Sequence, residues 1–279
     1  MVEENFAREI NTSSFEQRWK ENNRFKDRLR YNFECAKKDF LFAMKQTKMS
    51  KKNKKVLDIG FGSGLMMFNF HSSCELYGTE FSEYSITMSN KIAKRKKYKK
   101  YNFIIPENSE ILPYENGYFD IIIASHVVEH VEKDKLFLSE MYRCLKKDGI
   151  MFVICPIDNL NSDELLSEDE LMNPLYLQKK HWHVRNYNEV SFNNRFKHLS
   201  APIIFQKFDM KIWDWKVRLD PFRNKLSSTL IGKPIDFIIR LAINIPLSII
   251  PLSTLDMLDS FFGKLGYKNR QCIVAIKKI

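Results

Sequence analysis

The stretch that decides the fold is KKVLDIGFGSGLMMF, residues 54–68. It holds three of the nine glycines of the chain within five positions, namely Gly60, Gly62 and Gly64. Glycines gathered in this way mark a backbone that takes positive φ or approaches another molecule closely. The apolar run 56–59 before them is typical of a buried parallel strand, and 65–70 after them is the expected start of a helix. Strand, glycine turn and helix predict the nucleotide-binding end of a doubly wound, mainly parallel α/β sheet.

Two kinds of nucleotide-binding motif are excluded because residues that they require are missing. The dinucleotide fingerprint G-x-G-x-x-G requires glycine where Leu65 stands, and the Gly-Lys-Ser/Thr ending of a P-loop is missing. The remaining pattern, D-I-G-x-G-x-G from Asp58, resembles the first motif of the class I S-adenosylmethionine-dependent methyltransferases, in particular the type 11-like group. That resemblance implies a seven-stranded Rossmann-like sheet, S-adenosyl-L-methionine as cofactor and S-adenosyl-L-homocysteine as product.

The elements of that family follow in order along the chain. ELYGTE, residues 75–80, is the expected second strand, and YNFII, residues 101–105, the third. Leu112-Pro113 and then Phe119-Asp120 resemble the family's approach to strand four, which ends at Ser125-His126. RCLKKDGIMFVICP resembles the helix, Asp-Gly turn and fifth strand, while 206–215 and 270–279 resemble the last two strands. The resemblance covers residues 50–160 well and the last ten residues fairly.

The resemblance also implies which residues hold the cofactor. The glycine turn would approach its methionine and ribose portions, and Glu80, at the end of the second strand, would accept the ribose hydroxyls. The family's adenine-binding Asp is replaced by Asn108, with Glu107 beside it, so either of these two residues is the candidate, and Ser109 would offer its backbone N–H. The predicted cofactor-binding residues are Asp58, Gly60, Phe61, Gly62, Gly64, Glu80, Phe81, Glu107, Asn108, Ser109 and Ser125.

Histidines supply the candidate general bases, because an imidazole titrates near neutrality. His126 is expected to line the cofactor pocket. His181 and His183 belong to a predicted substrate loop, residues 156–190, where Trp182 and Arg185 would complete a polar and aromatic wall.

His126 also begins the spacing H-x-x-E-H with Glu129 and His130, which is an inverted zinc-protease motif. A zinc site of that kind needs a helix and a third ligand. Here the run starts directly after a buried strand, so no metal is expected and His130 is interpreted as a packed or hydrogen-bonded histidine.

The net positive charge of the chain favours an anionic partner, either nucleic acid or membrane. Forty-five Lys and Arg against thirty-four Asp and Glu leave a net charge of +11. The basic runs 48–55 and 94–100 both precede predicted strands, so they belong at the amino ends of the sheet, while the ligand crevice lies at the carboxyl ends. A solvated basic face is therefore favoured over a nucleic-acid site.

The chain divides into a predicted N-terminal helical lid, residues 1–50, and a methyltransferase domain, residues 51–279. A hydrophobic helical insert, residues 216–268, is too broken by proline and charge to span a membrane. It is expected to pack in the interior or in a homodimer, or to make peripheral membrane contact through 230–255. Five cysteines without a C-x-x-C spacing, and no apolar leader, favour a cytoplasmic, reducing location.

These observations predict an enzyme that transfers a methyl group from S-adenosylmethionine to an oxygen or nitrogen of a small-molecule, glycan or lipid-linked acceptor. Two alternatives remain open. One is an RNA methyltransferase, and the other is a cofactor-binding scaffold without catalysis.

Overall fold

The computed structural model describes residues 31–157, 183–209, 252–266 and 271–279. The elements on the first half of the sheet alternate strand and helix: α2 (Tyr31–Gln46), β1 (Lys55–Ile59), the short 3-10 turn η1 (Met67–Asn69), β2 (Glu75–Thr79), α3 (Glu83–Arg95) and β3 (Lys100–Ile104). The second half continues with β4 (Phe119–Ser125), η2 (Val128–His130), α4 (Asp134–Cys144), β5 (Leu145–Pro156), α7 (Glu189–Asn194), η3 (Lys197–Leu199), β6 (Ile203–Asp209), α10 (Leu252–Lys264) and β7 (Gln271–Lys277).

The seven strands form one sheet in the order β3-β2-β1-β4-β5-β7-β6. Strands β1 to β5 pair in parallel, whereas β7 lies antiparallel between β5 and β6. The predicted doubly wound, mainly parallel seven-stranded sheet is therefore confirmed, with the last strand as the one reversed member. Because the order turns at β1 and β4, the carboxyl ends of these two strands form the switch point at which such sheets bind ligands.

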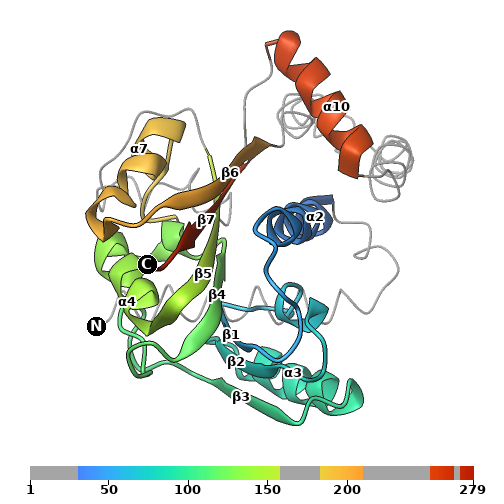
Figure 1. The fold of residues 1–279 in the computed structure, drawn as a ribbon, viewed down its shortest axis with the longest axis vertical. Coiled ribbons are helices and arrows are strands. Elements are labelled where there is room, and N and C mark those ends of the chain that lie inside the picture. Colours follow the sequence, from blue (N-terminus) through green and yellow to red (C-terminus); the bar gives the residue numbers. More distant parts are fainter. Residues whose placement is uncertain (1–30, 158–182, 210–251, 267–270) are drawn as a thin grey trace, which may run out of the picture.

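Each face of the sheet carries its own hydrophobic core. On β4, Ile122 and Ala124 pack with α4, η2 and α7, whereas Ile121 and Ile123 pack with α2, η1 and α3. Figure 1 shows these two layers of helices on opposite sides of the sheet. Side chains alternate between faces along a strand, so a strand covered on both sides needs an unbroken apolar run. The sequence IIIA in β4 and IMFVIC in β5 meet that need.

The segment after the glycine turn differs from the expected helix. Only one 3-10 turn forms there, η1. The Asn69 side-chain amide donates to the carbonyls of Leu65, at 2.5 Å, and Met66, at 3.0 Å, and so occupies acceptors that a continuing helix would use. Phe68 and Phe70 pack into the core instead. The prediction of a helix beginning over 65–70 is thus wrong in its extent.

The described part of the predicted lid is a core helix. Phe40, Ala43 and Met44 on α2 are buried at helical spacing, and Phe40 meets Phe152 of β5 edge to face with ring centres 5.3 Å apart. Asp39 is buried beside them and pairs with Lys207 of β6 at 3.1 Å. Residues 1–30, on which a covering role would depend, lie outside the described residues, so the lid remains a prediction.

The amino ends of the strands are held by charge. Asp120, at the start of β4, accepts a hydrogen bond from the Lys55 N–H at 2.9 Å and pairs with Lys146 at 2.9 Å and Lys54 at 3.6 Å. The exposed basic run 94–100 ends α3 and begins β3 at this same edge. Within the described residues, no helix has the length and apolar character needed to cross a membrane.

Candidate active site

The glycine turn follows β1 at the switch point. Gly60, Gly62 and Gly64 have φ of 59°, 49° and 69°, in the left-handed region that glycine adopts without strain. A Cβ on Gly60 would lie 2.7 Å from Cγ2 of Val127, and one on Gly64 would collide with the Phe68 ring. The turn therefore presents bare backbone where any larger residue would need both a strained conformation and new space.

Glu80 fixes this turn from the end of β2. Its Oε2 accepts a hydrogen bond from the Gly62 N–H at 2.7 Å, and its Oε1 accepts from Phe81 at 2.7 Å and Ser82 at 3.2 Å. The side chain is buried, with 5% of the residue exposed. Burial raises the pKa of Glu80, against the opposing effect of the three N–H donors. The predicted ribose acceptor is thus also the group that holds the glycine turn in shape.

Asp58 lies beneath the same turn, on β1. It is 2% exposed, and its Oδ2 accepts from the Met67 N–H at 3.2 Å. Burial raises the pKa of Asp58 to about 8, and the nearby charge of Glu80 adds to the rise while the Met67 N–H opposes it. Two acids therefore stand side by side at a buried point, an arrangement that favours a ligand carrying positive charge.

The residues predicted for the adenine lie after β3. The Asn108 side-chain oxygen accepts hydrogen bonds from the backbone of Glu110, at 2.6 Å, and Ile111, at 2.9 Å, so its two lone pairs are used within the turn. Glu107 beside it is exposed. Of the two candidates left open by the sequence, this arrangement favours the Glu107 carboxylate as the acceptor. Ser109 is half-buried next to them.

β4 delivers a second group of residues to the switch point. Its last residue is Ser125, and His126 then takes φ of 57° while its N–H donates to the Ile154 carbonyl at 2.8 Å. A positive φ at histidine costs energy, and such strain gathers at functional sites. The side chain of the next residue, Val127, is the one that packs against Gly60.

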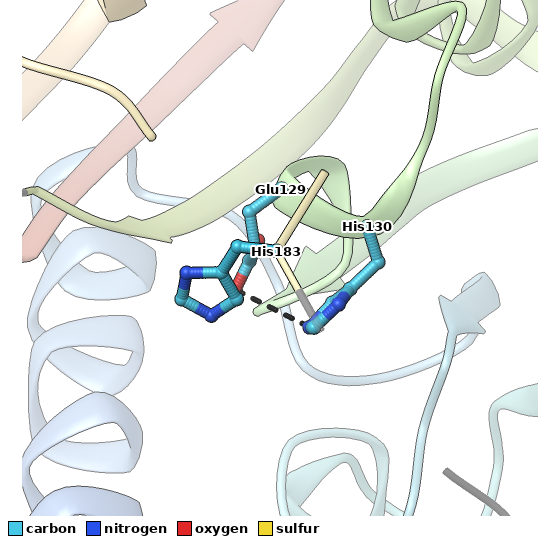
Figure 2. Close-up of side chains that lie close together, drawn as sticks. All are labelled: Glu129, His130 and His183. Carbon is cyan, nitrogen blue, oxygen red and sulfur yellow. Dashed lines mark ion pairs between the residues drawn. The ribbon is translucent and has the colours of Figure 1, made fainter. Parts of the chain in front are cut away.

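Glu129 is the centre of an imidazole cluster at this point (Figure 2). Its Oε1 lies 3.5 Å from Nδ1 of His126 and 3.9 Å from Nε2 of His130. The His183 ring lies 5.1 Å from the His130 ring, centre to centre, and potential ligand atoms of Glu129, His130 and His183 all lie within 4.8 Å of one another. The structure therefore brings His183 close to Glu129 and His130 of the H-x-x-E-H motif, which begins at His126.

Burial and the neighbouring imidazoles shift the pKa of Glu129 in opposite directions. Burial alone would raise its pKa, but the His126 imidazole and the charges of His130 and His183 outweigh that effect and lower the pKa of Glu129 to about 2. The residue is 1% exposed. Its Oε2 is approached by the Cys155 thiol at 3.8 Å. Among the described residues, its Oε1 has no hydrogen-bond partner.

A buried ion pair holds His183 in place. The Val184 N–H donates to the Glu129 carbonyl at 2.9 Å, and Arg185 pairs with Asp134 at 2.7 Å. Tyr187 donates to the same carboxylate at 2.7 Å. Arg185 is 5% exposed, so its predicted place on a polar wall at the mouth of the crevice is wrong: it is an internal anchor. His181 and Trp182 lie outside the described residues.

Sequence reasoning missed Glu129 as a site residue. The signal was present in the H-x-x-E-H spacing, but the third imidazole comes from a segment more than fifty residues away. That contact depends on the Arg185–Asp134 ion pair, which no local sequence pattern predicts.

The chain is similar in sequence to several known proteins. Residues 50–213 match a family model described as a methyltransferase domain. The ubiquinone biosynthesis O-methyltransferase of Pelagibacter ubique is 33% identical over 150 residues, which are 50% of this chain and 59% of that protein. The ajmaline N-methyltransferase of Rauvolfia serpentina is 23% identical over 178 residues, covering 61% of this chain and 58% of that protein. The chain thus spans less than two thirds of either relative.

A solved structure supports the fold. The phosphoethanolamine N-methyltransferase 2 of Haemonchus contortus, in complex with S-adenosyl-L-methionine, superposes with a TM-score of 0.53 at 15% identity. The match covers 86% of this chain and 52% of that one.

Proposed function

Since the chain belongs to the class I S-adenosylmethionine-dependent methyltransferases, by its match to the family model over residues 50–213, we propose that it methylates an oxygen or nitrogen of a small-molecule, glycan or lipid-linked acceptor. Its relatives include proteins named as O-methyltransferases and N-methyltransferases. The family establishes the kind of cofactor, while the acceptor is the subject of the proposal.

The residues at the switch point fit the cofactor. S-adenosylmethionine supplies a methyl group that its sulfonium already activates for transfer. The bare turn from Gly60 to Gly64 would admit the ligand close to the backbone, because no Cβ can stand at Gly60 or Gly64. Asp58 and Glu80 would face its positively charged and hydroxyl-bearing parts, and Phe81, which follows Glu80 in the sequence, would border the same site. Glu107, with Asn108 and Ser109, would bind the adenine, and Ser125 would border the pocket from β4.

The observation that carries the acceptor chemistry is the position of the Glu129 cluster. Val127, which packs against Gly60, lies between His126 and Glu129 in the sequence, so we expect the imidazoles to lie close to the glycine turn. An imidazole next to an ionised carboxylate can take a proton from a hydroxyl or an ammonium group. His126, His130 and His183 are half-buried or exposed, so an acceptor entering from solvent could reach them.

RNA is the less favoured acceptor. The basic run 94–100 begins β3 and therefore lies at the amino edge of the parallel strands, while the glycine turn and the Glu129 cluster lie at the carboxyl edge. A nucleic acid docked on these lysines would be held on the far side of the sheet from the proposed methyl transfer.

A lipid-linked or otherwise apolar acceptor has support in α10, the helix that precedes β7 in the sequence. Around α10, Met257, Phe261 and Leu265 recur every four residues and are 65%, 55% and 57% exposed. An exposed apolar stripe of this kind suits a membrane surface or a second copy of the chain. Most of the predicted contact, 230–251, lies outside the described residues, so peripheral attachment and a cytoplasmic location are proposals. Phe261→Asp would reduce liposome pelleting if the stripe meets lipid.

The test is transfer of label. The protein is incubated with methyl-labelled S-adenosylmethionine and cell extract, and label is counted in the lipid, small-solute, protein and RNA fractions. We expect label in lipid or small solutes, reduced in a Gly60→Val variant. Label confined to RNA would replace the proposed acceptor class. Cofactor binding without label in any fraction would point to a non-catalytic scaffold.

A further inference from the structure

The Glu129 cluster contains a buried carboxyl oxygen that the described contacts do not fully satisfy. Glu129 is 1% exposed, yet its Oε1 has no hydrogen-bond partner within the described residues. A buried ionised carboxylate is costly unless it is paired or coordinates a metal. Its nearest nitrogens, on His126 and His130, stand at 3.5 and 3.9 Å, beyond a good hydrogen bond.

The donor set around this oxygen is that of a metal site. Glu129 and His130 come from η2, and His183 comes from the separate segment before α7 (Figure 2). Their ligand atoms lie within 4.8 Å of one another, so an ion between them could contact all three after a small adjustment. Two imidazoles and one carboxylate form a known three-residue catalytic zinc set, in which a fourth position stays open.

We propose that Glu129, His130 and His183 hold a divalent transition-metal ion, with zinc as the ion that best suits their chemistry. The ion would give Oε1 the partner that it lacks among the described residues. His183 is the further ligand that is missing when the H-x-x-E-H run is considered alone as a zinc site.

The support around the cluster is of the kind that metal ligands need. His183 is held on its carboxyl side by Val184, whose N–H bonds to the Glu129 carbonyl, and by Arg185, which is locked to Asp134. His126 stands against the same Glu129 oxygen as a neighbouring imidazole. Groups that orient ligands in this way commonly control metal affinity.

The proposal, which rests on the proposed methyl transfer, narrows the acceptor to a hydroxyl-bearing molecule. His130 and His183 are partly exposed, so the open position would face solvent and an incoming acceptor. A bound metal lowers the pKa of a coordinated oxygen and favours its deprotonated form, with the proton passing to water. The imidazoles would then act as ligands rather than as the base.

The experiment measures zinc directly. The protein is stripped with a chelator, dialysed against Zn²⁺ alone, and assayed for bound metal, in parallel with His183→Ala and Glu129→Gln. His198→Ala is the matched control, because this exposed histidine on η3 contacts Ser139 and not the cluster. We expect about one zinc per chain in the parent and control, and at least about 100-fold weaker binding in both cluster variants.

Folding and function are read separately. Circular dichroism and S-adenosylmethionine titration establish that each variant is folded, and His130→Ala replaces either variant that fails this check. Zinc binding that is absent from the parent, or equal in parent and cluster variants, overturns the metal site. Full methyl transfer by stripped protein overturns the part given to the metal in deprotonating the acceptor, while it leaves the proposed function intact. Zinc binding at the cluster without methyl transfer to any fraction retains the site and removes the proposed function instead.

Discussion

Replacing Asp58 by asparagine should change how the stability of the chain depends on pH. Asp58 is buried, and its pKa is raised to about 8 in the folded chain, chiefly by burial. In the unfolded chain it returns to the ordinary value near 4. Between these values the folded chain holds a proton that the unfolded chain releases. Asp58→Asn keeps the shape and an oxygen for the Met67 N–H, but it removes the titration.

The magnitude follows from one proton. Where the folded state binds about one proton more than the unfolded state, the free energy of unfolding falls by about 1.4 kcal/mol per pH unit. The stabilisation from Asp58 is thus fully present below the unfolded pKa and is lost as pH rises toward the folded pKa. Between pH 5 and pH 7.5 the parent should lose about 3 kcal/mol relative to Asp58→Asn.

The assay is urea unfolding followed by circular dichroism at half-unit steps across that interval, without cofactor. Asp120→Asn is the matched control. Burial acts on Asp120 too, but the Lys55 N–H and the Lys146 ammonium hold its pKa below the ordinary value. Its contribution therefore changes only in stronger acid, and the difference from the parent should be flat here. An equally flat difference for Asp58→Asn would mean that the buried carboxyl is ionised in the folded chain, and the reasoning would fail.

Three further changes test the cofactor turn and the anchor. Glu80→Ala should weaken S-adenosylmethionine binding by at least about 1.5 kcal/mol in calorimetry, whereas Glu83→Ala, at an exposed acid nearby, should not; equal affinities would remove Glu80 from the site. Gly64→Ala should lower the free energy of unfolding by about 1 to 3 kcal/mol, because the new Cβ would strain the backbone at positive φ and collide with the Phe68 ring. The loss should be larger than for Gly266→Ala, where a Cβ meets nothing within 4 Å. Asp134→Asn should lower the free energy of unfolding, measured by urea unfolding, by about 3 kcal/mol, because it leaves the buried Arg185 and the half-buried Arg195 without their carboxylate. A loss under about 1 kcal/mol would contradict that anchoring role.

Much of the fold is local information and could be predicted. The run IIIA is apolar on both faces because β4 is covered on both sides, and the glycines of the turn are required by positive φ and by Val127. Both signals lie within a few residues of the structure they specify. The length of the helix after the turn could not be predicted in this way, because Asn69 ends it through a side-chain bond that competes with the backbone.

The same distinction between local and long-range contacts applies to the residues of the site. Asp58, the glycines and Glu80 stand at strand ends whose order alone brings them together, so a motif sufficed. The meeting of His183 with Glu129 depends instead on the pairing of Arg185 with Asp134, a tertiary contact between distant segments. The prediction for Arg185 is wrong because a charged residue in a loop is normally assigned to the surface, whereas this one is buried by its pairing with Asp134.

The reversed strand β7 has a consequence for synthesis. It lies between β5 and β6, and β6 has no other partner in the described sheet. While residues 271–277 remain inside the ribosome, β5 presents an open edge and β6 has nothing to join. The nascent chain must therefore carry an incomplete sheet until almost all of these 279 residues have been translated, and an unpaired edge of that kind recruits other strands. Expression yield should accordingly be sensitive to chaperone supply and to changes within this last strand.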